Sequence, residues 1–318
     1  MVADWPWAAA PIGNGSLQTR VLSVDMVQET DRMLVVHAHP DDEVLGTGGV
    51  IAKHTAAGGQ VTLVTCTLGE EGEILLPEIA HLAADQTDGL GPHRITELAG
   101  SVAALGVQDS RFLGGAGHYR DSGMMGEPSN AVPESFWQAD LREAATILVE
   151  IIRQTQPIVL VTYDDFGGYG HPDHIQAHRV AMYASQLAAV ASYRPDLGPA
   201  WDIAKIYWIC FPASAIRAGI LALRERGDQS AFAARDPDDL PFAIPDSAVT
   251  TAVDVSAQLP QKVAAFRAHA SQVNLEEGFF ALSNNIGSPI FSEEYFRLVK
   301  GVPSGPLDQD GREIGLFG

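Results

Sequence analysis

Short apolar, β-branched runs alternate with amphipathic stretches from residue 32 onward. This alternation is typical of strands joined by crossover helices around a parallel sheet. The runs are almost continuously apolar, which indicates strands buried on both faces. The predicted strands are 33–39, 60–67, 111–113, 157–163 and 205–211, and the predicted helices are 44–57, 93–105, 140–154, 174–191 and 258–270. The pattern predicts an α/β fold with a mostly parallel sheet and helices on both faces.

Two stretches between these elements lack any regular period. Residues 114–133 are rich in Gly, Ser, Asn and Pro, and loops of this length in compact domains are usually functional or mobile. Residues 227–246 form a polar insertion that we interpret as a solvated connection. Residues 1–31 are interpreted as an N-terminal extension, since no basic segment precedes a long apolar run there. Residues 32–318 are predicted to form the functional domain.

The excess of acidic over basic residues limits the classes of partner that the chain is expected to bind. The 318 residues include 40 Asp and Glu against 20 Lys and Arg, a formal charge of −20. This excess repels phosphate backbones and anionic lipid, so we expect neither a nucleic-acid nor a membrane partner. Cys66 and Cys210 lie in apolar runs and are predicted to be buried, reduced thiols, which favours a cytoplasmic protein. Ten histidines among many carboxylates leave a mixed His/Asp metal site open.

Two His-Pro-Asp tripeptides follow two of the predicted strands. The first lies in His39-Pro40-Asp41-Asp42-Glu43, and the second in His171-Pro172-Asp173-His174. Open α/β sheets bind ligands at the carboxyl ends of their strands. Proline suits the first turn of a helix, so each tripeptide is a rigid helix entry whose side chains can converge on one crevice. Asp41 and Asp42 could each merely cap a helix, but the repeated pattern favours chemistry.

Three side chains in these motifs have the donor types of a metal site. His39 and Asp42 lie three residues apart on one turn, and His174 would complete a set of two nitrogens and one carboxylate. Catalytic zinc sites typically use three protein ligands and leave one position for water. Iron(II) suits the same set, so the sequence predicts zinc with iron(II) as the alternative.

The remaining polar side chains of the motifs fit hydrolysis. Asp41 is positioned to take a proton from a metal-bound water, and His171 to act as an acid or to stabilise an oxyanion, with Asp173 as its orienting partner. Competing motifs are absent: the sequence has no GxxxxGK[ST], HExxH, GxSxG or GxGxxG. In the predicted strand the side chain of His37 points to the opposite face from those of its sequence neighbours. We therefore interpret His37 as a core or supporting histidine. The sequence therefore predicts metal-assisted hydrolysis.

Several segments resemble the LmbE-like, or PIG-L, family of zinc-dependent N-deacetylases. They are residues 36–43, 64–73, 113–117, 120–124, 167–174 and 281–285, and the resemblance extends from about residue 32 to the C-terminus. It implies a Rossmann-like fold, zinc ligands at His39, Asp42 and His174, and a general base at Asp41.

The resemblance also assigns roles around the predicted metal. It implies that Tyr169 polarises the amide carbonyl, that His171 supplies positive charge or a proton, and that Asp173 tunes His171. It further implies sugar contacts at Arg94 and Asp121. The C-terminal part, from about residue 200 to 318, is expected to help form the substrate pocket.

The activity that the resemblance implies is removal of acetate from N-acetylglucosaminyl-inositol, a small amino-sugar of mycothiol biosynthesis. Mycothiol S-conjugate amidase is an alternative, because that sister group shares the metal ligands. Gly46 and Gly170 stand where the amidases typically carry Lys and Pro, which favours the deacetylase. Another N-acetylglucosamine-type deacetylase, and a zinc-containing sugar-binding protein without turnover, are the remaining alternatives.

Overall fold

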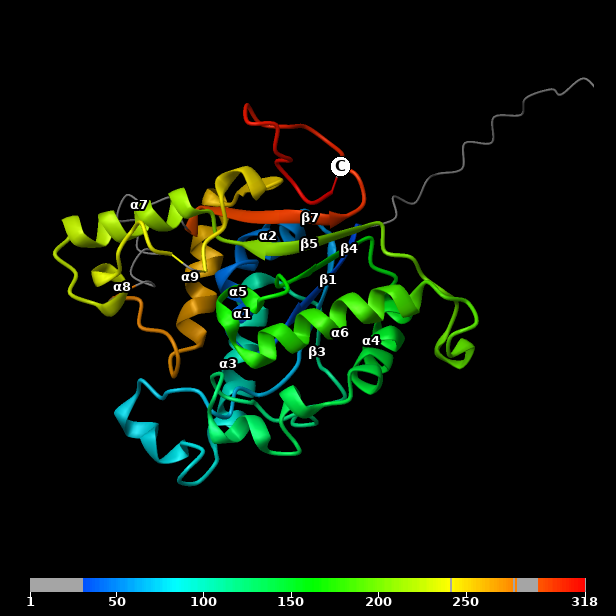
Figure 1. The fold of residues 1–318 in the computed structure, drawn as a ribbon, viewed down its shortest axis with the longest axis horizontal. Helices are drawn as coiled ribbons and strands as arrows, with labels where there is room; N and C mark the ends of the chain where they lie inside the picture. Colours follow the sequence, from blue (N-terminus) through cyan, green and yellow to red (C-terminus); the bar gives the residue numbers. More distant parts are fainter. Residues whose placement is uncertain (1–30, 241, 277, 279–290, 318) are drawn as a thin grey trace, which may run out of the picture.

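A seven-stranded, mostly parallel sheet organises the computed structural model, which describes residues 31–240, 242–276, 278 and 291–317 (Figure 1). The strand order is β3-β2-β1-β4-β5-β7-β6. The first five strands in that order pair in parallel, and β7 and β6 pair antiparallel at one edge. The strands are β1 Arg32–His37, β2 Gln60–Thr65, β3 Asp109–Phe112, β4 Val159–Thr162, β5 Lys205–Cys210, β6 Thr251–Asp254 and β7 Glu293–Lys300.

Helices cover both faces of this sheet because alternate side chains of its central strands are buried on opposite sides. On β1, Met33 and Val35 join a core with α2, α3, α7 and α9, whereas Leu34 and Val36 join a core with α4 and α6. The helices are α1 Asp42–Leu45, α2 Gly48–Ala56, α3 Leu90–Leu105, α4 Leu141–Thr155, α5 Gly167–Gly170, α6 Pro172–Ala188, α7 Ala213–Glu225, α8 Ala231–Ala234 and α9 Leu259–Ala268.

The predicted fold class is confirmed, but several elements differ from the prediction. Helix α7 was not predicted, and the short helix α8 lies within the insertion 227–246. The helix expected over 44–57 is broken into α1 and α2, because Thr47 turns its hydroxyl back to the Glu43 carbonyl at 2.8 Å and to His37 at 2.9 Å. The edge strands β6 and β7 were not predicted. The N-terminal extension up to residue 30 and the segment 281–285 lie outside the described residues.

The order of the strands places the two His-Pro-Asp motifs together. β1 and β4 are neighbours, yet the chain leaves β1 toward α2 on one face and leaves β4 toward α6 on the other. Such a switch point opens a crevice at the carboxyl ends of the strands. Within the described part of the chain, no helix has the length and apolar character needed to cross a bilayer.

Candidate metal and catalytic site

The three predicted metal ligands meet at the switch point. His39 follows β1, Asp42 begins α1, and His174 lies in the first turn of α6. The Asp42 carboxylate lies between the two rings, with one oxygen 3.3 Å from His39 Nδ1 and the other 3.3 Å from His174 Nε2. Residues from two separate helix entries therefore face one another, as the sequence predicts.

Hydrogen bonds orient both imidazoles toward Asp42. His174 Nδ1 lies 3.2 Å from the Gly167 carbonyl, which only accepts, so Nδ1 carries the proton and Nε2 presents a lone pair. That Nε2 is buried and has no hydrogen-bond partner among the described residues. His39 Nε2 lies 3.2 Å from the Asp173 carboxylate, so Nε2 carries a proton. Burial would lower the pKa of His39, but Asp121, Asp173 and Asp42 raise it well above its ordinary value, so a metal ion at Nδ1 would displace a proton from the ring. Histidine ligands of metals are held by this kind of outer hydrogen bond.

These donors fit a divalent cation. Burial lowers the pKa of His174 to about 4, against the opposing charge of Asp42, so the ring is neutral as a ligand must be. Burial alone would raise the pKa of Asp42, but His174 and His39 hold it well below its ordinary value. An orphaned buried nitrogen beside an ionised carboxylate is a feature that a bound metal ion explains.

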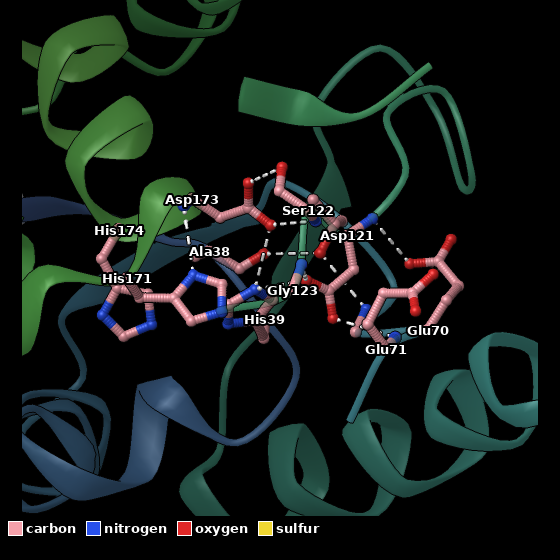
Figure 2. Close-up of polar contacts among 12 residues, drawn as sticks. Ala38, His39, Glu70, Glu71, Asp121, Ser122, Gly123, His171, Asp173 and His174 are labelled. Carbon is pink, nitrogen blue, oxygen red and sulfur yellow. Dashed lines mark hydrogen bonds and ion pairs between the residues drawn. The ribbon is translucent and has the colours of Figure 1, made fainter. Parts of the chain in front are cut away.

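His171 joins the same cluster with a defined tautomer. Ring nitrogens of His39, His171 and His174 lie within 4.8 Å of one another (Figure 2). His171 caps α6, and its Nδ1 accepts the Asp173 amide at 3.1 Å, so Nε2 carries the proton. Burial, aided by His39 and His174, lowers the pKa of His171 to about 3. A neutral ring with its proton on Nε2 fits donation of a proton from His171, and the role of His171 in the reaction stays a prediction.

Asp41 combines an unusual backbone with a cationic neighbour. Its backbone φ angle is 116°, in a region that residues with a Cβ rarely adopt. Arg94 Nη2 donates to the Asp41 carboxylate at 3.0 Å. Burial raises the pKa of Asp41 to about 6, and Arg94 opposes that rise. A carboxyl group that exchanges a proton near neutral pH has the property of a general base.

Arg94 is placed inside the protein, on α3. Its side chain is 3% exposed, and besides Asp41 it donates to the carbonyls of Pro40 and, at 2.9 Å, Gly69. These contacts join α3 to the loops that follow β1 and β2. The sugar contact expected of Arg94 stays a prediction. The structure adds a contact that was not expected, the hydrogen bond from Arg94 to the Asp41 carboxylate.

The loop 114–133 contributes Asp121 and Ser122 to the site. The Asp173 carboxylate accepts from the Ser122 amide at 2.9 Å and from its hydroxyl, and it faces His39 (Figure 2). The Asp173 carboxylate thus contacts His39, and the Asp173 amide donates to His171. The tuning of His171 by Asp173 stays a prediction. Asp121 accepts from the amides of Glu71 and Gly123 and lies 3.4 Å from His39 Nε2.

Tyr169 lies at the opening of the site. Half of its side chain is exposed, and its ring centroid is 4.9 Å from that of His174 and 6.1 Å from that of His171. Beside it is a cavity of about 300 Å³, lined mostly by apolar side chains: Leu45, Tyr169, Phe211, Ile216, Phe232, Arg235 and Phe242. Most of this lining comes from the C-terminal part of the chain.

Sequence reasoning missed several supporting residues. Tyr163 stacks on His174 with ring centroids 4.2 Å apart and donates to, or accepts from, His37 at 3.1 Å. His37 is thus a hydrogen-bonded core histidine, which is one of the two positions predicted for it. Cys66 and Cys210 are buried free thiols, as predicted. Tyr163 ends the predicted strand 157–163 and is separated from the second motif by residues 164–170, so only its place at a strand end hinted at a role.

Comparison with known proteins points to one family. The model of the PIG-L family, described as GlcNAc-PI de-N-acetylase, matches residues 34–185. A Geodermatophilus obscurus protein named 1D-myo-inositol 2-acetamido-2-deoxy-alpha-D-glucopyranoside deacetylase is 58% identical over 287 residues, which are 90% of this chain and 97% of that protein. A protein of the same name from Nocardioides sp. is 57% identical over 295 residues, with the same coverage of both chains.

Solved structures share the fold at lower identity. The N,N'-diacetylchitobiose deacetylase from Pyrococcus horikoshii matches with a TM-score of 0.58 at 20% identity, covering 86% of this chain and 85% of that one. A 4-carboxy-2-hydroxymuconate hydratase from Pseudomonas putida matches with a TM-score of 0.57 at 21% identity, covering 87% and 100%. Because these two enzymes catalyse different reactions, the fold alone does not define the chemistry.

Proposed function

The chain belongs to the PIG-L family, and from this membership we propose that it deacetylates 1D-myo-inositol 2-acetamido-2-deoxy-alpha-D-glucopyranoside, that is, N-acetylglucosaminyl-inositol. The products would be acetate and the free amine, in mycothiol biosynthesis. The observation that carries the proposal is the convergence of His39, Asp42 and His174 beside Asp41 in a chain 58% identical to a relative with that name.

A divalent metal ion is part of the proposal. His39, Asp42 and His174 would hold it, with zinc as the expected ion and iron(II) as the alternative. When bound, such an ion would lower the pKa of a water ligand to about 7 and polarise a carbonyl group. Asp173 supports this arrangement by holding Nε2 of His39, so that Nδ1 stays available.

The protein's own groups would move the protons. We assign Asp41 as the base that takes a proton from the attacking water, because its pKa is raised to about 6 by burial. Water attack on the amide carbon produces a tetrahedral oxyanion. The Nε2 proton of His171 and the hydroxyl of Tyr169 are the proposed donors to this oxygen, and the base returns its proton to the departing amine.

Substrate recognition is proposed to use both halves of the chain. Arg94 and Asp121 are the proposed sugar contacts, although both side chains also hold neighbouring protein groups. The residues after about 200 form most of the cavity beside Tyr169 and are proposed to help form the substrate pocket of the domain 32–318. A chain of charge −20 suits a neutral glycoside better than an anionic lipid or nucleic acid. The proposed location is the cytoplasm.

The test compares turnover of N-acetylglucosaminyl-inositol and of a mycothiol S-conjugate, with metal content measured in the same samples. The proposal expects amine release mainly from the acetylated sugar. Faster cleavage of the conjugate would favour the amidase instead. Equilibrium binding of the sugar without release of acetate would indicate a zinc-containing sugar-binding protein.

A further inference from the structure

The strained backbone of Asp41 needs outside support. At φ 116° and ψ −30° it lies outside the regions favoured by residues with a Cβ. Such residues persist only where surrounding contacts fix them. Arg94 holds the Asp41 carboxylate, and the Val44 amide donates to the Asp41 carbonyl at 3.0 Å. The amide of Asp41 has a third partner, the side chain of Glu43, at 2.9 Å.

Glu43 is a buried carboxylate that connects Asp41 to two helices. Its exposed fraction is 0%, which is costly for a charged group without partners. One oxygen accepts from the Asp41 amide. The other accepts from the Ser101 hydroxyl on α3 and lies 2.7 Å from His269 Nε2 at the end of α9. Glu43 therefore links the backbone of Asp41 to side chains on α3 and at the end of α9.

His269 is suited to hold Glu43. It is fully buried and is the residue that ends α9, where the helix dipole favours a cation. Because a carboxylate only accepts, Nε2 of His269 must carry the proton in this contact. Its Nδ1 has no hydrogen-bond partner among the described residues, so Glu43 is the polar group that defines the ring's orientation.

We propose that Glu43 and His269 form a positioning pair that fixes the strained backbone of Asp41, so that the carboxylate of Asp41 faces the metal-binding side chains. Among the described residues neither side chain of the pair is hydrogen-bonded to His39, Asp42 or His174, and the pair acts through the Asp41 amide. The inference rests on the proposed function, since it concerns the base of that reaction.

The test substitutes His269 in two ways. His269→Leu keeps comparable volume and removes the donor, whereas His269→Gln retains an N–H that reaches Glu43. We expect the leucine variant to lose about ten- to a hundred-fold in kcat, with KM and metal content unchanged, as for other outer hydrogen-bond partners. The glutamine variant should recover most of kcat. Hydrogen exchange of the Asp41 amide, measured without substrate, should be faster in the leucine variant alone.

Lys262→Met is the matched control. Lys262 is on the same helix, is equally buried, and pairs with Glu294 at 2.6 Å without contacting the site. It should lower thermal stability while leaving kcat per folded molecule unchanged. Should His269→Leu not fold, Ser101→Ala removes another donor to Glu43 and should reduce kcat in the same way, by less.

Three results would contradict the positioning role of the Glu43–His269 pair. They are a wild-type kcat in His269→Leu, equal losses of kcat in the leucine and glutamine variants, and a loss of kcat in Lys262→Met that matches that of His269→Leu. A wild-type protein that releases no amine would instead reject the proposed function. The exchange of the Asp41 amide would still report on the pair in that case.

Discussion

Asp41 and Asp42 are adjacent carboxyl groups whose surroundings move their pKa values in opposite directions. Burial dominates at Asp41 and raises its pKa to about 6. At Asp42 the facing His174 and His39 outweigh burial and keep the carboxylate ionised. Divergent environments of this kind separate a proton acceptor from a permanent anion. The sequence predicted a role for each carboxyl group but not the difference between their pKa values, because that difference depends on contacts that form on folding.

The contact between Arg94 and Asp41 could likewise not be predicted from the sequence. It spans 53 residues and arises because α3 packs beside the loop after β1. The residues alone favoured a surface position on a helix for Arg94, and the family resemblance favoured a sugar contact. Ser122, Tyr163 and His269 escaped prediction for the same reason, since no local pattern marks a residue whose role is to hold another.

Arg94→Lys separates the two roles of this side chain. Lysine cannot donate in the fork geometry that reaches Pro40, Asp41 and Gly69 together. If the main role is to hold Asp41, kcat should fall about ten- to a hundred-fold with KM nearly unchanged. Steady-state kinetics on the acetylated sugar measure the split. A rise in KM at unchanged kcat would assign Arg94 to the sugar alone.

At the scale of elements, the pattern of apolar residues predicted the central strands of the sheet well and the edge strands β6 and β7 poorly. β1, β2, β4 and β5 are nearly continuous apolar runs because helices cover both faces. β7 carries Glu293, Glu294, Arg297 and Lys300, so its sequence resembles a polar connection. Its Glu294 is nevertheless buried, where it accepts from the first amides of α2 and from Lys262.

The loop after β2 is fitted closely to α3 at Gly69. This residue has φ +69°, and a Cβ there would lie 1.9 Å from Arg94 Nη1. Gly69→Ala should therefore displace the guanidinium and lower kcat, beyond the ~1 kcal/mol that a left-handed alanine costs. Gly58→Ala is the control, since its φ is +89° and nothing lies within 4 Å of the added Cβ. Equal kcat in the two variants, with both folded, would contradict this reading of Gly69.

At the scale of the whole molecule, few of the 40 acidic residues belong to the site, and one of the others fastens the C-terminal segment to the sheet. Glu313 accepts from Lys205 at 2.7 Å and from Tyr207 at 2.9 Å, both on β5, and from the Ser304 amide at 2.7 Å. This segment is red in Figure 1, and its Glu313 forms a bridge with Thr251 on β6. Composition predicts a solvated acidic surface and cannot distinguish this buried carboxylate from it.

The Glu313 contacts predict a pH-dependent contribution to stability. Burial would raise the pKa of Glu313, but Lys205 and the hydrogen bonds hold it below its ordinary value of 4.5. Ionised Glu313 therefore stabilises the folded state above that value, and the contribution is lost as pH falls through the lower folded pKa. Glu313→Gln should melt at a lower temperature than wild type at pH 7, and the gap should narrow in acid. A gap that is constant or widens toward acid would refute this.

The central claim is that this chain is a metal-dependent deacetylase in which Asp41 is the base. Its most direct test is the rate of amine release from N-acetylglucosaminyl-inositol by Asp41→Asn, with bound metal measured in the same preparation. Asparagine keeps the size of the side chain and leaves His39, Asp42 and His174 in place. We predict full metal content with kcat reduced by about 10²–10⁴-fold. Turnover near the wild-type rate in the metal-loaded variant would contradict the claim.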